Sequence, residues 1–138
     1  MRELTVDATL ENIEKVTDFI NETLEGYGCS LKAQTQIDIA VDELFSNIVR
    51  YAYHPEIGSA TVQIDQEDGS PYMVLTFKDS GKPYNPLERE DPDVTLSAEE
   101  RGVGGLGIYL VKKSMDDVQY EYQDGQNILR IKKRITKS

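Results

Sequence analysis

Apolar residues follow two helical repeats in the first third of the chain. The first repeat spans residues 9–28 and closes at Gly26 and Gly28. Its apolar positions are Leu10, Ile13, Val16, Phe19, Ile20 and Leu24. The second begins after Ser30, the expected N-cap, and ends before Pro55. Its apolar stripe is Ala33, Ile37, Ala40, Val41, Leu44, Ile48 and Ala52. The spacing predicts two amphipathic helices, the second the longer.

Strand-like alternation occupies most of the remainder. Residues 59–66 and 71–79 alternate around the turn "EDGS", and residues 117–135 form two further runs around "QDGQ". A short strand is expected at residues 4–6, and a third helix is indicated by Leu106, Ile108, Val111 and Met115. Residues 80–105 show no period. We therefore expect one α+β domain over residues 1–138, a two-layer sandwich with helices on one face of a mostly antiparallel mixed sheet.

Composition narrows the possible functions. The formal charge is −10, from 25 acidic and 15 basic residues, which disfavours direct binding to nucleic acid. The one basic cluster, "RIKKRITKS" at the C-terminus, is interpreted as charges that guard an exposed strand edge. With a single cysteine, no apolar N-terminal leader and no apolar run of membrane-spanning length, the expectation is a cytoplasmic protein without a membrane segment.

The stretch "GVGGLG", residues 102–107, matches the spacing of a dinucleotide-binding loop. That interpretation fails because a polar loop precedes it where a buried strand is required. A P-loop fails too, since no Gly-Lys-Ser/Thr follows. Two interpretations stay open. The glycines form a hinge without a ligand, or they lead into a helix N-terminus that favours an anion.

Two polar side chains stand at the edge of the second helix's apolar stripe. Glu43 and Asn47 are four residues apart and so share a face. A carboxylate and an amide oxygen in this arrangement suit Mg²⁺ together with a hydroxyl or water. The alternative is an ordinary solvated helix face.

Asp79 ends the strand at residues 71–79 and begins the stretch "DSGKP". One interpretation is a turn-forming aspartate. The other is a buried carboxylate that accepts from an exocyclic amine, with Gly81 allowing a base to approach the backbone closely. Such a carboxylate selects adenine over guanine, which presents a carbonyl at that position.

Three segments in this order, "DELFSNIVRYAY", "DSGKP" and a long loop ending in "GVGGLGIYLV", resemble the GHKL-type ATP-binding fold of gyrase, Hsp90, histidine kinases and MutL. Within it the chain is most similar to the small bacterial anti-sigma factor serine/threonine kinases. The resemblance covers nearly the whole chain.

The resemblance implies roles for particular residues. Glu43 is then the general base, or the orienter, for an attacking hydroxyl, and Asn47 the Mg²⁺ ligand. Asp79 then accepts a hydrogen bond from the adenine amine, and Gly81 lies beneath the base. A lid at about residues 85–103 closes over the phosphates. The phosphate contacts are then Arg101 in the lid and, after it, Gly104, Gly105, Leu106 and Gly107. Asn127 takes the place where relatives usually have Thr or Ser, as a hydrogen-bonding partner.

By the same resemblance the protein binds ATP and Mg²⁺. It is expected to bind a sigma factor, to phosphorylate a serine on a STAS-type anti-anti-sigma protein and to act as a homodimer. The main alternative is a nucleotide-binding regulatory module without kinase activity. An ATPase subunit of the gyrase or MutL kind needs further domains, for which 138 residues leave no room, and His54 is interpreted as a structural helix-end residue.

Overall fold

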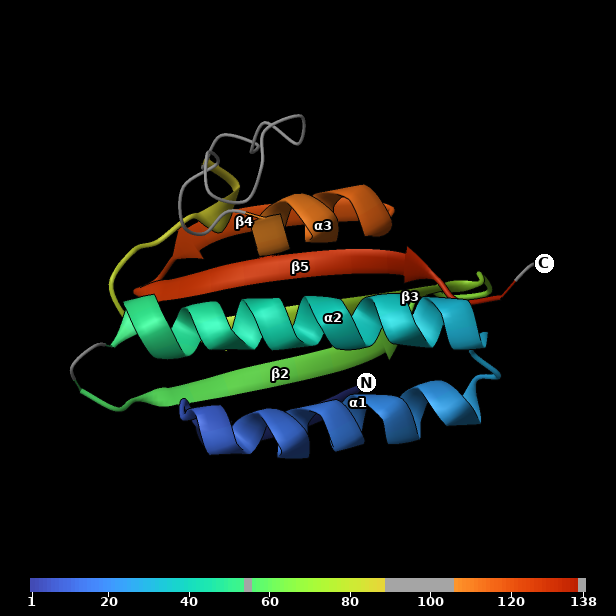
Figure 1. Cartoon of the computed structure of the whole chain (residues 1–138), viewed down its shortest axis with the longest axis horizontal. Coiled ribbons are helices and arrows are strands. Elements are labelled where there is room, and N and C mark those ends of the chain that lie inside the picture. The colour runs from blue at the N-terminus through green and yellow to red at the C-terminus, as the bar shows by residue number, and fades with distance from the viewer. Residues whose placement is uncertain (54–55, 89–105, 137–138) are drawn as a thin grey trace.

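The computed structural model describes residues 1–53, 56–88 and 106–136, and within them a five-stranded sheet forms one layer (Figure 1). The strands are β1 (Arg2–Asp7), β2 (Ser59–Gln66), β3 (Tyr72–Asp79), β4 (Asp117–Gln123) and β5 (Gln126–Arg134). Their order in the sheet is β1-β2-β3-β5-β4, and all four pairings described are antiparallel.

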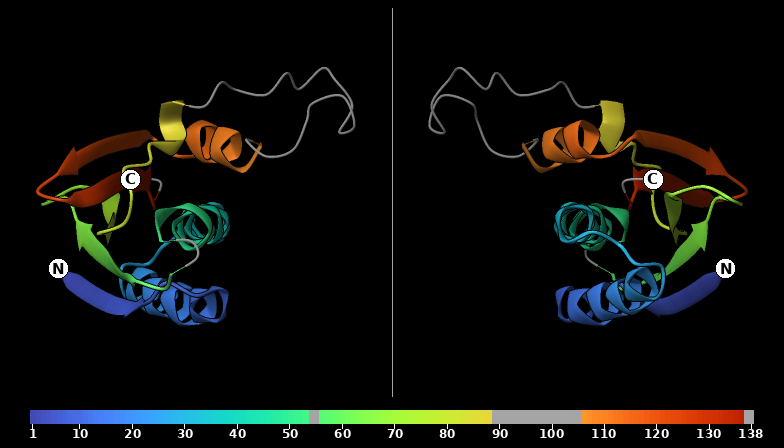
Figure 2. Two further views of the ribbon diagram at one scale, coloured as in Figure 1. Left: turned by 90° about the vertical axis from the view of Figure 1, so that its left-hand side faces the viewer. Right: turned by 90° about the vertical axis from the view of Figure 1, so that its right-hand side faces the viewer.

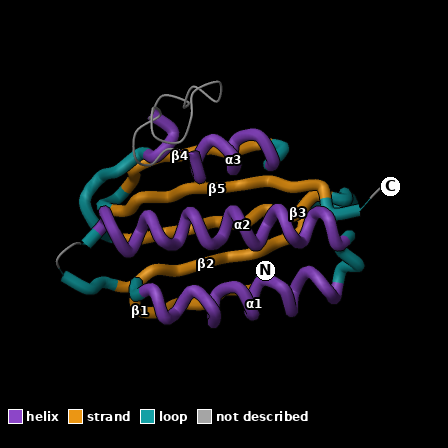
Figure 3. The backbone as a smooth tube through the Cα atoms, in the orientation of Figure 1, coloured by secondary structure: helices purple, strands orange, loops and turns teal. Residues whose placement is uncertain are grey.

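The second layer consists of α1 (Ile13–Gly26), α2 (Leu31–Asn47) and α3 (Leu106–Ser114). Views turned by 90° show these helices on the same face of the sheet (Figure 2), and the view facing the layers shows α2 in the middle (Figure 3). The predicted two-layer α+β sandwich is thereby confirmed. No helix in the described ranges has the length and apolar character needed to cross a bilayer.

The apolar stripe of α2 forms the centre of the core. All seven predicted stripe residues are buried, together with Phe45, and they pack between the sheet and the flanking helices. Ser30 is the N-cap as predicted, since its Oγ accepts from the backbone N–H of Ala33 at 3.2 Å. Because α2 is anchored to the sheet along its length, polar groups at its C-terminal end have fixed positions.

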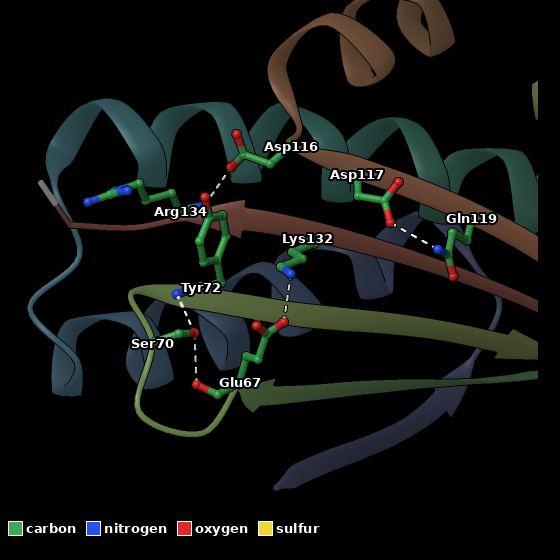
Figure 4. A network of polar contacts seen from close by, with 8 residues as sticks. All are labelled: Glu67, Ser70, Tyr72, Asp116, Asp117, Gln119, Lys132 and Arg134. Atoms are coloured by element: carbon green, nitrogen blue, oxygen red, sulfur yellow. Dashed lines mark hydrogen bonds and ion pairs between the residues drawn. The ribbon is translucent and has the colours of Figure 1, made fainter. Parts of the chain in front are cut away.

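Two details differ from the sequence expectations. Leu10 does not join the stripe of α1: it lies in a 3-10 turn, Leu10–Asn12, ahead of the helix and is 56% exposed. The C-terminal basic cluster does not guard a strand edge, because β5 lies between β3 and β4. Lys132 instead pairs with Glu67 at 2.7 Å, and the backbone N–H of Arg134 donates to Asp116 at the start of β4 (Figure 4).

The C-terminal end of α2 widens into a π-helical turn, Ile48–Ala52. Here it meets the segment that follows β3, where Lys82 N donates to Ala52 O at 2.8 Å. A side chain on Gly81 would place its Cβ 2.3 Å from the same oxygen. Glycine is therefore required at position 81 for the chain after β3 to pack against α2.

Candidate functional site

A pocket opens where the C-terminal end of α2 meets the end of β3 and the start of β5. Apolar side chains, among them Leu44, Ile48 and Phe77, form much of its wall. Three buried polar side chains share this wall: Asn47, Asp79 and Asn127. An apolar cleft with a few converging polar groups is the usual form of a small-molecule site.

Asp79 is the last residue of β3 and is 5% exposed. Its Oδ1 accepts from Gly81 N and from Asn127 Nδ2, each at 2.9 Å. No hydrogen bond to Oδ2 is found among the residues that the structure describes. Burial raises the pKa of Asp79, and the bonds from Asn127 and Gly81 oppose that rise. The carboxylate thus has one oxygen fixed by the protein and one available as an acceptor.

Asn127 pairs with Asp79 across the β3–β5 ladder and is equally buried. Besides the bond to Asp79, its Nδ2 donates to Lys82 O at 2.7 Å. Its Oδ1 accepts from Tyr84 N at 3.0 Å and from the hydroxyl of Tyr120. An amide has two N–H donors and two acceptor lone pairs, so all of them are used within the protein. Asn127 thus lies next to Asp79, and its amide is fully engaged within the protein.

Asn47 ends α2 and is 7% exposed. Its Nδ2 has no hydrogen-bond partner within the described part of the chain. An unpaired buried amide costs about 1–3 kcal/mol, so native proteins rarely leave one without a purpose. The solvated-face interpretation is wrong for Asn47, and its amide is free to meet a polar ligand.

Glu43 is half-buried, one turn before Asn47 on α2, and it faces the start of α3. A Cβ on Gly107 would lie 2.1 Å from both Cδ and Oε2 of Glu43. Only glycine lets the first turn of α3 approach this carboxylate so closely. No cluster of three or more acidic, histidine or cysteine side chains that could hold a metal occurs in the described ranges. A cation here therefore depends on oxygens from its ligand as well as from protein.

The remaining predicted residues fall in or beside the stretch that the structure leaves undescribed. Arg101, Gly104, Gly105 and nearly all of the expected lid at residues 85–103 lie outside the described residues, as does His54. Leu106 begins α3, as predicted.

Three tyrosines near the pocket were not predicted from the sequence. Tyr84 and Tyr120 line it, and the ring of Tyr84 stacks on Tyr51 of the π-helical turn, with centroids 4.8 Å apart and planes at 26°. Alternation in β4 carried a usable signal for Tyr120, because this residue pairs with buried Leu129 and so faces the helix layer. No sequence signal marked Tyr84.

Comparison with known proteins bears on this arrangement. The profile of the histidine kinase-like ATPase domain matches residues 6–133. The serine-protein kinase RsbW of Listeria monocytogenes is 32% identical over 111 residues, which cover 76% of this chain and 69% of that protein. The serine-protein kinase RsbW of Bacillus cereus is 28% identical over 96 residues, covering 68% of this chain and 60% of the relative. The chain thus spans about 60% of the length of several curated relatives.

Two solved structures share the fold. One contains the RsbU and RsbW domains of Rv1364c from Mycobacterium tuberculosis, with a TM-score of 0.64 at 15% identity, covering 100% of this chain and 34% of that one. The other is the Acinetobacter baumannii histidine kinase AdeS, with a TM-score of 0.50 at 16% identity, covering 99% of this chain and 70% of that one. At these identities the likeness concerns the fold alone.

Proposed function

The chain belongs to the histidine kinase-like ATPase family, and on that premise we propose that it binds Mg-ATP in the pocket between α2, β3 and β5. The observation that carries the proposal is the state of Asp79: buried, with Oδ1 held by two donors and Oδ2 without a partner among the described residues. A carboxylate oxygen in a pocket wall without a protein donor is available to a donor from a ligand.

Asp79 is the proposed residue that recognises the base. Its Oδ2 accepts from the exocyclic amine of adenine, while guanine presents a carbonyl there and is repelled. Gly81 lies beneath the base in this proposal. The Asp79 carboxylate acts best as an anion, because a protonated Oδ2 would donate where the amine also donates. Its bonds from Asn127 and Gly81 favour the charged form against the cost of burial.

The phosphate end lies between α2 and α3. Asn47 offers Oδ1 to Mg²⁺, and its unpaired Nδ2 suits a phosphate oxygen. The buried unpaired amide of Asn47 and the Glu43 carboxylate beside Gly107 fit a metal–phosphate group in donor and acceptor chemistry. Mg²⁺, when bound, neutralises phosphate charge. The first turn of α3 adds about 0.3–1 kcal/mol of favourable field for an anion.

The proposed lid at residues 85–103 and the residues that follow it supply the rest of the phosphate contacts. Arg101 is the proposed contact within the lid, and Gly104, Gly105, Leu106 and Gly107 are the proposed contacts that follow it. Because each helix terminus contributes little, an arginine is expected to carry a large share of the charge on the γ-phosphate.

The proposed reaction is transfer of the γ-phosphoryl group of ATP to a protein serine. Glu43 orients the serine hydroxyl and accepts its proton as Oγ forms a bond to the γ-phosphorus. The bond from phosphorus to the β–γ bridging oxygen breaks, and ADP leaves. The half-buried carboxylate of Glu43 lies beside Gly107 at the start of α3, which supports this role.

The partners belong to the same proposal. The relatives are named serine-protein kinases. The resemblance to anti-sigma factor kinases adds a sigma factor, a STAS-type anti-anti-sigma protein as the serine substrate, and a homodimer. A cytoplasmic location and a single domain over residues 1–138 remain predictions from the sequence.

The decisive experiment measures binding and transfer separately. Wild type and Glu43→Gln are incubated with radiolabelled Mg-ATP and candidate STAS proteins, while the nucleotide-induced shift of the melting temperature is recorded for both. Glu43→Gln should keep the thermal shift and lose serine labelling. A wild type that shows the shift but never labels a serine would identify a nucleotide-binding regulatory module instead. A wild type without any shift at millimolar Mg-ATP would refute the site itself.

A further inference from the structure

The base pocket is too small for a purine base in this structure. Its cavity measures about 30 Å³, which is room for one or two water molecules. A purine ring needs far more space than that. Asp79 lines this cavity, so a purine base fits against it only after part of the wall has moved.

The movable part of the wall is the segment of residues 82–86, which we term the pocket cover. Tyr84 and the buried Pro86 both line the cavity from this segment. The other walls belong to α2, the π-helical turn that follows it, β3, β4 and β5, whose lining residues are packed into the core or paired in the sheet. Moving the cover disturbs the least regular structure.

Asn127 fastens this cover. Its Nδ2 donates to Lys82 O at 2.7 Å, and its Oδ1 accepts from Tyr84 N at 3.0 Å. The same amide also holds Asp79 at 2.9 Å. One side chain therefore joins the base-recognising carboxylate to the segment that blocks it. A threonine or serine at this position is too short, and has too few donors and acceptors, to make all these bonds at once.

Resting on the proposed nucleotide site, we propose that Asn127 is a positioning residue that holds the pocket cover shut and thereby limits the rate at which nucleotide enters. Opening breaks the bonds from Asn127 to Lys82 O and Tyr84 N and separates Tyr84 from Tyr51, while the bond from Asn127 to Asp79 and the bond from Lys82 N to Ala52 O can persist. Nucleotide therefore associates slowly, but the hydrogen bond between Asp79 and the base is unaffected once it has formed.

Stopped-flow fluorescence with ADP labelled on the ribose tests the proposal. Asn127→Thr should bind about tenfold faster, since it loses two bonds that each contribute modestly in water. Its preference for adenine over guanine nucleotides should be kept, because Asp79 is unchanged. Asn127→Ser should behave in the same way. Tyr122→Phe is the control: Tyr122 lies opposite Asn127 on β4 but does not line the cavity, and its rate should equal that of wild type.

Hydrogen exchange of wild type gives a second measurement that does not depend on any variant folding. The amide of Tyr84 is bonded to Asn127 and should exchange slowly in the free protein. With Mg-ADP it should exchange faster, the reverse of ordinary ligand protection.

Slower exchange at residues 82–86 on binding would overturn the proposal, as would an unchanged association rate in Asn127→Thr. An altered protein that merely loses stability would show a lower melting temperature without faster association. If wild type binds no nucleotide, the proposed function fails, which is a different outcome from binding that Asn127 does not control.

Discussion

Replacing Asp79 by asparagine tests the base site with almost no change in shape. Asparagine is isosteric with aspartate, and its Oδ1 can still accept from Gly81 N and Asn127 Nδ2. Its Nδ2 then stands where Oδ2 stood, facing the pocket. A donor would meet the exocyclic amine of adenine, which is also a donor, whereas guanine now offers a carbonyl to it.

The expected loss can be estimated from the contacts. A hydrogen bond to a charged group contributes about 1.5–3 kcal/mol, so Asp79→Asn should weaken ATP binding about 100-fold. At a ligand concentration of about 100 times the wild-type dissociation constant, nucleotide stabilises wild type by roughly 2.7 kcal/mol and the variant by about 0.4 kcal/mol. For a domain of this size the shifts in melting temperature should be about 9 °C and about 1 °C respectively.

The nucleotide-free variant should be at least as stable as wild type at neutral pH. Burial raises the pKa of Asp79 above its ordinary value of 3.8, so the folded protein binds the proton more firmly than the unfolded chain. The free energy of unfolding of wild type therefore falls as pH rises through the window between 3.8 and the raised folded pKa. Asp79→Asn lacks this contribution. Urea unfolding between pH 4 and pH 7 should show a flatter profile for the variant.

Thermal shift assays with Mg-ATP and Mg-GTP, run beside unfolding curves without nucleotide, separate the possible outcomes. The expected result is a stable variant that loses the ATP shift and gains relative preference for GTP. An unchanged ATP shift with unchanged adenine preference would remove Asp79 from base recognition. A variant that unfolds without nucleotide would show that the charge of Asp79, and not its shape, holds the β3–β5 end together.

Three further substitutions test residues that position the site or stabilise the helix that carries it. Gly81→Ala should destabilise the protein by about 1–3 kcal/mol in urea unfolding, because its Cβ would meet the backbone of Ala52 at 2.3–2.6 Å; equal stability would contradict the close approach. Gly107→Ala should leave stability equal or higher by up to about 1 kcal/mol, yet reduce serine labelling, because the new methyl displaces the flexible Glu43 carboxylate; full labelling would refute that geometry. Ser30→Ala should cost about 1 kcal/mol of unfolding free energy with an unchanged nucleotide-induced shift, and a smaller shift would show that this cap affects the site.

Most of the fold was predictable because its signals are local. The stripe of α2, the N-cap at Ser30 and the alternation of β2 and β3 each need only a few neighbouring residues to be recognised. Leu10 misled the periodicity because it continues the spacing of α1 by three residues, whereas the helix begins at Ile13. The position of β5 was missed for another reason: strand order is a long-range property, and a basic terminal segment gives no indication of which strands flank it.

The separate residues of the site could be predicted from the sequence, but the hydrogen bonds that join them could not. Helical spacing put Glu43 and Asn47 on one face, and strand-end position marked Asp79. Asn127 is 48 residues from Asp79, and the bonds that exhaust its amide come from Lys82, Tyr84 and Tyr120. No local pattern predicts the small size of the base pocket or the hydrogen bonds between Asn127 and the pocket cover. Both arise only when the chain after β3 packs against β5.

The register of β3 against β5 links the core to the proposed chemistry. Leu75 pairs with Ile131 and Phe77 with Leu129, and all four side chains are buried beneath the helices. Two residues further along the same face, this register brings Asp79 opposite Asn127. A slip by one residue would turn a strand's apolar set to solvent, at a cost of several buried side chains, and would break the contact between carboxylate and amide. The apolar pairs therefore fix the register on which the contact between Asp79 and Asn127 depends, and mutations in the β3–β5 core should alter base recognition.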